Sequence, residues 1–304
     1  FTDSRYAEQA KAEAPAFQVV MTVTEKDLLK DVLDDLKLTR VGFEKDHITY
    51  AGWERLKKRL EPQELIGVSH WVEDLRARKS AAEVEFMIKA QEITDDAFGR
   101  FLPSIKAGAK EVDLAIELEF IMRKMGSDGI AFPVIAVSGS RSSLPHGVPT
   151  ERKLQRGDFV TFDFGAKYGG YCSDMTRTVV VGSVGDKHRA IYETVLKAQL
   201  AALDLIKPGI PAKDVDTAGR TVIENAGYGQ YFGHGIGHGV GLDIHEKPSV
   251  SGQSEDVLEP GMVITVEPGI YIPGFGGVRI EDLVLVTETG NRNLTQSNKQ
   301  LIVV

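Results

Sequence analysis

Four acidic residues stand in two stretches that are rich in β-forming residues. The first pair is Asp163 and Asp174, on either side of a turn signal at Tyr168-Gly169. The second pair is Glu267 and Glu281, on either side of a turn around Gly274. Each stretch predicts a β-hairpin in which the two acids of a pair lie directly opposite each other. Opposed carboxylates repel by roughly 3 kcal/mol at an effective dielectric constant near 20, so something must offset that repulsion.

Carboxylates can also face each other on a solvated surface, where water and salt weaken the repulsion. That interpretation suits one isolated pair, but these acids stand among residues typical of buried strands, such as Phe162 and Val266. The same arrangement also occurs twice in the chain. Divalent cations between the carboxylates explain both observations, because a metal ion reverses the local charge and keeps the carboxylates ionised.

A glycine-rich segment between the two hairpins contributes three histidines, His234, His238 and His245. Thirteen glycines lie between 227 and 277, and they let the backbone approach a bound group closely. The same glycines argue against a zinc-binding helix, and no Glu follows His234 as an HExxH motif requires. The nucleotide-binding patterns GxGxxG and GxxxxGK[ST] are not matched either.

Four carboxylates and one neutral imidazole suit two ions of Mn²⁺, Co²⁺ or Zn²⁺ better than they suit Ca²⁺. We therefore predict a dinuclear metal site. Such a site can lower the pKa of a shared water and bind a substrate carbonyl, which are the requirements of amide hydrolysis.

The composition argues against several other classes of protein. Hydrophobic residues make up 42% and charged residues 26%, as in soluble globular proteins, and the apolar stretches are too short to span a membrane. A net charge of −8 without a local basic patch argues against a nucleic-acid partner. The single cysteine, Cys172, forms no internal disulfide and favours a cytoplasmic location. We expect it to be a small buried filler, since it has no identified base partner.

A length of 304 residues predicts two domains. We assign 1–76 to a small α/β N-terminal domain and 77–304 to a larger α+β domain. The first contains the short apolar run 17–23 and the charged, helix-like stretch 25–37.

The larger domain is predicted to be internally duplicated, because two helices followed by a hairpin occur twice in it. Its first helix begins at Ser80, since Glu83 stands three positions later and completes a capping box. The predicted helices are 80–103, 111–125, 186–206 and 212–226, and the predicted strands and hairpins are 132–137, 158–182, 262–272 and 278–286.

Five short motifs follow one another in this domain. They are Leu144-Pro145-His146-Gly147-Val148-Pro149, Asp163-Phe164-Gly165 with Ser173-Asp174-Met175-Thr176-Arg177, the segment from His234 to His245, Val266-Glu267-Pro268-Gly269-Ile270-Tyr271, and Val278-Arg279-Ile280-Glu281-Asp282. Together they resemble the Xaa-Pro peptidases of the pita-bread metallopeptidase superfamily, from about residue 75 to the end. The opening stretch Phe1–Tyr6 is similar to the later part of the small N-terminal domain of these enzymes, so we expect that domain to be incomplete here.

The resemblance implies a role for each candidate site residue. Glu267 would be the general base, and His146 and His245 would stabilise the tetrahedral intermediate. His234 would shape the substrate pocket, and Arg279 would either steady the ligand cluster or meet a substrate carboxylate. The implied ligands of two divalent ions, commonly Mn²⁺ or Co²⁺, are Asp163, Asp174, His238, Glu267 and Glu281, with Asp174 and Glu281 bridging both ions.

The implied reaction is hydrolysis of the bond between an N-terminal residue and proline in a small peptide. This bond is a tertiary amide without an N–H, so a metal site suits it better than a protease that binds that group. A dipeptidase (prolidase) is favoured, and an aminopeptidase P acting on longer peptides is the alternative. A creatinase-like enzyme without metal and a non-catalytic binding protein are less favoured, because all five ligands are present. A metal-stabilised structural protein is a third, blander alternative. A homodimer is expected from the resemblance.

Overall fold

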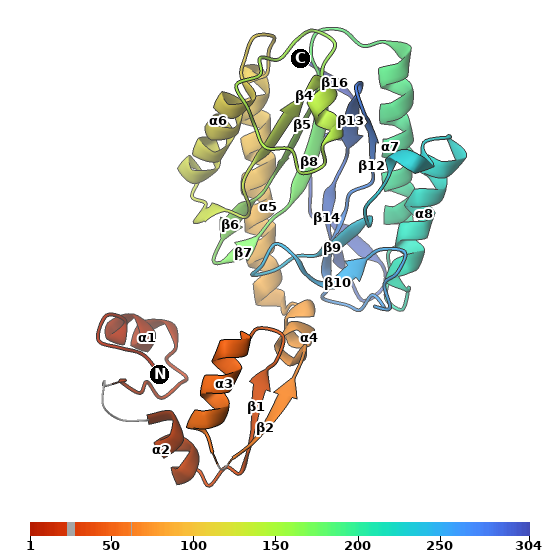
Figure 1. Cartoon of the computed structure of the whole chain (residues 1–304). Coiled ribbons are helices and arrows are strands. Elements are labelled where there is room, and N and C mark those ends of the chain that lie inside the picture. The colour runs from red at the N-terminus through yellow and green to blue at the C-terminus, as the bar shows by residue number, and fades with distance from the viewer. Residues whose placement is uncertain (23–27, 62) are drawn as a thin grey trace. The chain divides into compact units, whose positions relative to one another are not determined.

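The computed structural model describes residues 1–22, 28–61 and 63–304 of the chain (Figure 1). The internal contacts divide these residues into two compact units, Phe1–Trp71 and Val72–Val304. Among the described residues, no helix combines the length and the apolar character needed to cross a membrane.

The first unit is an α/β unit, as predicted. β1 and β2 pair in parallel, with helix α3 between them in the chain. Phe43 of β1 stacks on Trp53 of α3, with 4.6 Å between the ring centroids, and this contact joins the helix to the sheet. The elements of this unit are α1 (Ala7–Glu13), α2 (Leu28–Asp35), β1 (Arg40–Glu44), α3 (Tyr50–Arg59) and β2 (Glu64–Val68).

Two stretches of this unit stand out in the sequence, the apolar run 17–23 and the helix-like stretch 25–37. The apolar run 17–23 forms no strand in its described part, where Met21 makes only an isolated bridge to Thr2. Its residues stay largely exposed, so no sheet is present there to pair and bury them. The helix predicted at 25–37 is observed as α2, and residues 23–27 lie outside the described part of the chain.

The four predicted helices of the second unit begin and end close to the predicted positions, whereas the helix at Trp71–Ala77 was not predicted. Ser80 accepts from the backbone N–H of Glu83, whose carboxylate accepts from the N–H of Ser80, so the predicted capping box is present. The periodic apolar positions are buried, including Met87 and Phe101. The helices are α4 (Trp71–Ala77), α5 (Ala81–Phe101), α6 (Glu111–Lys124), α7 (Asp186–Leu205) and α8 (Ala212–Asn225).

The strands of the second unit repeat one arrangement. β5 lies between β4 and β8, β11 lies between β9 and β14, and all four pairings are antiparallel. Two helices precede each set, so the predicted internal duplication is present. The strands are β3 (Gly129–Ile130), β4 (Ile135–Ser138), β5 (Phe159–Phe164), β6 (Ala166–Tyr168), β7 (Tyr171–Cys172), β8 (Met175–Val180), β9 (Gly237–Gly239), β10 (Glu246–Val250), β11 (Val263–Val266), β12 (Gly269–Ile272), β13 (Gly276–Arg279), β14 (Asp282–Val286), β15 (Asn291–Asn293) and β16 (Ile302–Val303).

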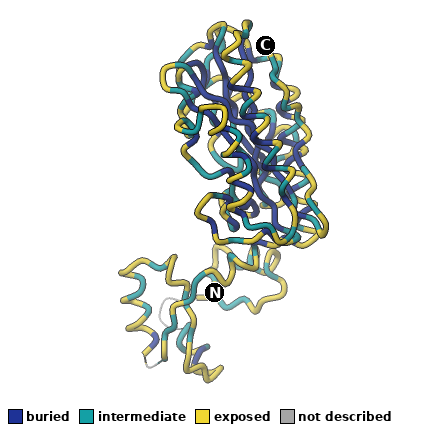
Figure 2. The backbone as a smooth tube through the Cα atoms, turned by 90° about the vertical axis from the view of Figure 1, so that its right-hand side faces the viewer, coloured by how far each residue is buried: buried dark blue, intermediate teal, exposed yellow. Residues whose placement is uncertain are grey.

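Helices cover the sheets of this unit from two sides. In Figure 1, α5 and α6 lie on one side of the strands, and α7 and α8 lie on the other. Phe101 of α5 meets Phe162 of β5 edge to face, with 5.1 Å between centroids, and Tyr192 of α7 belongs to a second apolar cluster with Ile264 of β11. Figure 2 shows that buried residues are concentrated in this unit. The paired helix layers therefore hold the strands that carry the candidate site residues.

The register of the first hairpin differs from the prediction. Asp163 lies opposite Thr176, and Asp174 is its diagonal neighbour, one residue before β8. The cause is the turn, which consists of Gly169 and Gly170 and not of Tyr168-Gly169. Both glycines have positive φ, 58° and 83°, as a two-residue hairpin turn of type I′ requires.

The register of the second hairpin is the predicted one. The ladder between β11 and β14 ends at Val266 opposite Asp282, so the next pair in the same register is Glu267 and Glu281. Each arm, predicted as one continuous strand, is interrupted at these acids. Glu267 and Glu281 therefore lie between strands and not within the regular pairing of a sheet.

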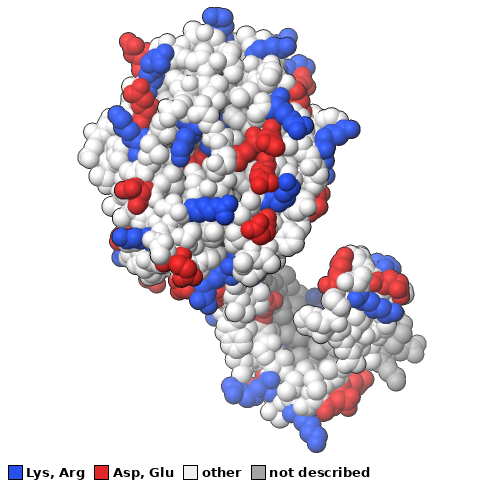
Figure 3. All heavy atoms as spheres, turned by 180° about the vertical axis from the view of Figure 1, so that it is seen from behind, with Lys and Arg blue, Asp and Glu red and all other residues white. Residues whose placement is uncertain are grey.

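Charges of both signs are mixed on the molecular surface. On the face seen in Figure 3, Lys and Arg side chains lie among Asp and Glu side chains, and no extended basic patch is visible. This distribution agrees with the net charge of −8.

Candidate metal centre and substrate pocket

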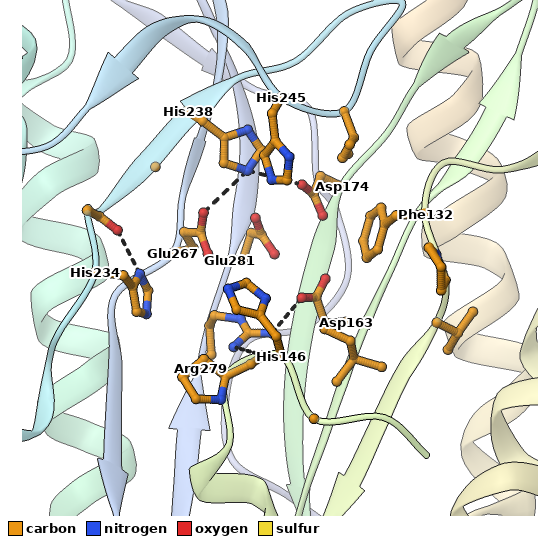
Figure 4. Close-up of a pocket in the computed structure, with 18 of the residues that line it drawn as sticks. Phe132, His146, Asp163, Asp174, His234, His238, His245, Glu267, Arg279 and Glu281 are labelled. Carbon is orange, nitrogen blue, oxygen red and sulfur yellow. Dashed lines mark hydrogen bonds and ion pairs between the residues drawn. The ribbon is translucent and has the colours of Figure 1, made fainter.

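One cavity of the second unit collects every site residue that the sequence predicted. Its volume is about 530 Å³, and both halves of the unit contribute to its walls. Figure 4 shows the carboxylates and imidazoles directed toward a common space. The predicted residues that line it are His146, Asp163, Asp174, His234, His238, His245, Glu267, Arg279 and Glu281.

The four carboxylates come from corresponding places in the two halves. Asp174 directly precedes β8, and Glu281 directly precedes β14. Asp163 lies near the end of the central strand β5, and Glu267 directly follows the central strand β11. The duplication therefore places two acids from each half at the middle of the sheets.

Burial and mutual repulsion make the ionised forms of these acids costly. Burial, followed by the nearby charge of Glu281, raises the pKa of Asp174 well above its usual range. Burial and the charge of Glu267 raise the pKa of Glu281 in the same way. Burial also raises the pKa of Glu267 to about 8, although the nearby Arg279 acts in the opposite direction. Fully ionised, the four acids would therefore carry more negative charge than the one guanidinium of Arg279 balances.

His238 is arranged as a metal-binding imidazole would be. Its Nδ1 lies 3.0 Å from the carbonyl oxygen of Gly239, so this nitrogen carries the proton and donates. The lone pair of Nε2 then faces the acids, 3.6 Å from Asp174 Oδ2 and 3.4 Å from Glu267 Oε1. Burial lowers the pKa of His238 to about 4, so the ring is neutral at physiological pH, as metal binding requires.

These residues fit a bound divalent cation. Asp174, His238 and Glu281 each offer one ligand atom, and the three atoms lie within 4.8 Å of one another. Carboxylate oxygen with one imidazole nitrogen is the donor set that Mn²⁺, Co²⁺ or Zn²⁺ accepts. The predicted ligands Asp163 and Glu267 lie outside this group of three, and Asp163 Oδ2 accepts a 2.5 Å hydrogen bond from Arg279 Nη2.

Arg279 is buried and fully engaged within the protein. Only 3% of it is exposed. Its Nε donates to Thr176 Oγ1 at 2.9 Å, and Nη1 donates to the Tyr271 hydroxyl and the Pro145 carbonyl at 3.0 and 3.2 Å. With Nη2 on Asp163, every nitrogen of the guanidinium has a partner. Of the two roles that the sequence left open, these contacts favour steadying the acidic cluster.

The other three histidines stand at different places on the cavity wall. His234 is bonded at both ring nitrogens, at 2.7 Å to the carbonyl of the next residue and at 2.9 Å to the Tyr271 hydroxyl. Burial lowers its pKa to about 4. His146 and His245 are exposed, and the ring of His245 packs edge to face on His238 with 4.4 Å between centroids.

Three residues that touch the site residues were not identified from the sequence. The hydroxyl of Thr176 donates to Glu281 at 2.6 Å, and that of Thr265 donates to Glu267 at 3.2 Å. Tyr271 joins Arg279 to His234, as described above. Strand alternation was the available signal for both threonines, because each stands two residues from a predicted ligand and so shares its side of the strand.

Comparisons with known proteins agree with this geometry. Residues 85–288 match the model of metallopeptidase family M24, and residues 1–78 match that of the creatinase/prolidase N-terminal domain. The Xaa-Pro dipeptidase of Pyrococcus horikoshii is 47% identical over 255 residues, which are 84% of this chain and 73% of that protein.

Solved structures agree as well. The Xaa-Pro dipeptidase from Bacillus anthracis superposes with a TM-score of 0.97 at 46% identity, over 99% of this chain and 85% of that one. The X-Pro aminopeptidase from Thermotoga maritima gives a TM-score of 0.91 at 38% identity, over 100% and 86%. The chain therefore belongs to metallopeptidase family M24 and has the pita-bread fold that its motifs predicted.

Proposed function

We propose that this protein is a metal-dependent Xaa-Pro dipeptidase (prolidase), which hydrolyses the bond between an N-terminal residue and proline. One observation carries the proposal: four acids and His238 line a single cavity in a chain of the M24 family. The similarity to proteins named Xaa-Pro dipeptidase, at 46 and 47% identity, supports this substrate class.

The proposed cofactor is a pair of divalent ions, with Mn²⁺ favoured and Co²⁺ or Zn²⁺ as alternatives. When bound, two such ions lower the pKa of a shared water and polarise the substrate carbonyl. The residues that would hold them are Asp163, Asp174, His238, Glu267 and Glu281, and Asp174 and Glu281 would serve both ions. The cost of ionising these buried, mutually repelling carboxylates, which bound cations would offset, supports this assignment.

Glu267 is the proposed general base. Its carboxylate takes a proton from the attacking water and delivers it to the departing proline nitrogen, which must be protonated before it leaves. The hydrogen bond from Thr265 to Oε1 orients this carboxylate toward the cavity.

His146 and His245 are proposed to donate hydrogen bonds to the reacting amide as its oxygen gains charge. In Figure 4 they approach the carboxylate cluster from opposite ends, His245 beside His238 and His146 beside Arg279. His234 and Arg279 are assigned to the wall of the pocket, where His234 shapes the substrate site and Arg279 orients Asp163.

The cavity wall suits a small peptide with apolar side chains. Phe132, Pro133, Val148 and Ile244 line it beside the acids. An aminopeptidase P acting on longer peptides is the second candidate, because the Thermotoga maritima aminopeptidase has the same fold over the whole chain. A homodimer and a cytoplasmic location complete the proposal, the latter supported by the single cysteine.

Incubation of the Mn²⁺-loaded protein with Ala-Pro, Ala-Ala and Ala-Pro-Ala tests the proposal. Cleavage of Ala-Pro alone is the expected result for a dipeptidase. Release of alanine from Ala-Pro-Ala would instead assign the protein as an aminopeptidase P. Turnover of none of the three peptides would overturn the peptidase assignment. Asp174→Asn is the matched control for contaminating peptidases, because it removes one proposed ligand.

A further inference from the structure

His245 and Glu246 are neighbours in the chain but face different surroundings. His245 ends the connection between β9 and β10, and Glu246 is the first residue of β10. His245 lines the cavity and Glu246 does not. The Glu246 side chain is only 6% exposed, so its carboxylate lies within the protein, behind the backbone that carries His245.

Three donors hold the Glu246 carboxylate. Oε2 accepts from Lys79 Nζ at 3.1 Å, and Oε1 accepts from Arg76 Nη2 and, at 3.0 Å, from the backbone N–H of Asp243. The Lys79 side chain is 1% exposed, so this pair is shielded from solvent. The carboxylate therefore joins the turn that precedes His245 to the segment in front of helix α5.

The turn itself fits closely around this carboxylate. A Cβ atom on Gly241 would lie 2.4 Å from Glu246 Oε2, so no larger residue fits there without a shift. The N–H of Gly241 donates to the carbonyl of Asp243 at 3.0 Å, and the carbonyl of Gly241 accepts from Cys172 N at 2.8 Å. Both hydrogen bonds hold the turn at Gly241. The ring of His245 is exposed, and it meets the ring of His238 edge to face, with 4.4 Å between centroids.

We propose that Glu246, anchored by Lys79 and Arg76, is a positioning residue that sets the place of the His245 ring at the cavity. The inference rests on the proposed function, because His245 receives its role there. Burial lowers the pKa of Lys79, and the charge of Glu246 opposes that shift, so the buried cation depends on this partner.

A double-mutant cycle on the full, Mn²⁺-loaded chain with Ala-Pro tests the inference. E246Q is expected to lower kcat about tenfold, the effect of one lost orienting contact, with unchanged KM and metal content. In the H245A background, E246Q is expected to change kcat by less than about twofold, because the imidazole that Glu246 positions is already absent. Equal losses in both backgrounds would overturn the inference.

Arg78 supplies the matched control. It lies between Arg76 and Lys79 in the chain, but it pairs with Glu259 at an exposed site. R78Q is expected to keep the kcat of the parent enzyme. Should E246Q alone fail to fold, K79M/E246Q removes both buried charges, and the same tenfold loss is expected from it; parental kcat in that variant would refute the positioning role.

A second measurement does not depend on turnover. In ¹⁵N-histidine-labelled, Zn²⁺-loaded protein, the ring signals of His245 are those that vanish in H245A. They are expected to shift or broaden in E246Q, whereas the ring of His188, which bonds the Gly157 carbonyl, stays unchanged. Unaltered His245 signals would contradict the inference even if Ala-Pro were not cleaved. Absence of Ala-Pro turnover would count against the proposed function, whereas unaltered His245 signals would count against this inference, so the two failures are distinguishable.

Discussion

The hydroxyl of Thr176 donates a 2.6 Å hydrogen bond to Oε2 of Glu281 and so joins the two halves of the second unit at one carboxylate. The backbone N–H of Glu281 donates in return to the Thr176 carbonyl at 3.2 Å. Both residues are almost fully buried. Since Thr176 also accepts from Arg279, it fixes the orientation of a proposed ligand from outside the ligand set.

Thr176→Val should therefore weaken metal binding. Loss of one orienting partner of a ligand typically lowers affinity about 10- to 100-fold, and titration of metal-free protein by calorimetry measures this change. Thr161→Val is the matched control, because Thr161 is equally buried but bonds Thr178 and not a carboxylate. Equal dissociation constants for the two variants would contradict the role given to Thr176.

Substitutions at the acids and at His245 should separate metal binding from catalysis. Asp174→Asn and Glu281→Gln remove a charge from the cluster and should lower both metal content and kcat. His245→Ala should lower kcat and leave metal content near that of the parent, because His245 is not a proposed ligand. Metal analysis after gel filtration, beside kcat on Ala-Pro, distinguishes these outcomes. The same metal stoichiometry in all three variants would refute the assignment.

Local signals in the sequence predicted the helices well. The capping box at Ser80 and Glu83 depends on residues three apart, and both of its hydrogen bonds are present. The apolar positions of α5 recur with helical spacing and are buried. Such features are set within one or two turns of chain, so they can be predicted without knowledge of the rest of the fold.

Features that depend on distant segments were predicted less well. The choice of turn residues at Gly169 and Gly170 moved Asp163 from its predicted partner Asp174 to Thr176. The pairing of Glu267 with Glu281 was correct, because the register of that hairpin agreed with the sequence. Three of the four partners of Arg279, namely Thr176, Pro145 and Asp163, come from segments more than a hundred residues away, and no local pattern indicates them.

Removal of the metal ions should make stability depend on pH in a particular direction. The pKa of Glu267 is raised from 4.5 to about 8, so the folded protein binds this proton more tightly than the unfolded chain. Such a group stabilises the fold at low pH, and its contribution is lost as the pH rises through about 8. Chelated protein should therefore show a falling Tm between about pH 5 and pH 8, a range set by these pKa values.

Metal-loaded protein should not share that decline, because bound cations balance the ionised acids. Scanning fluorimetry with chelator or with excess Mn²⁺ compares the two forms at each pH. Glu267→Gln is the control, since it removes one titrating group and should flatten the slope of the chelated form. A Tm that rises with pH in chelator would show that the acids are already compensated without metal.

Cys172 should be unreactive in the folded protein. It is fully buried, and burial raises the pKa of its thiol to about 11. At a pH three units below this pKa, only about one thiol in a thousand is ionised, and the thiolate is the form that reacts with iodoacetamide.

We expect alkylation of Cys172 to be at least about 100-fold slower in buffer than in urea, which exposes the thiol. Cys172 is the single cysteine, so mass spectrometry of the intact chain reports on it alone. Similar rates in both conditions would mean that the thiol is accessible, and its assignment as a buried filler would then be wrong.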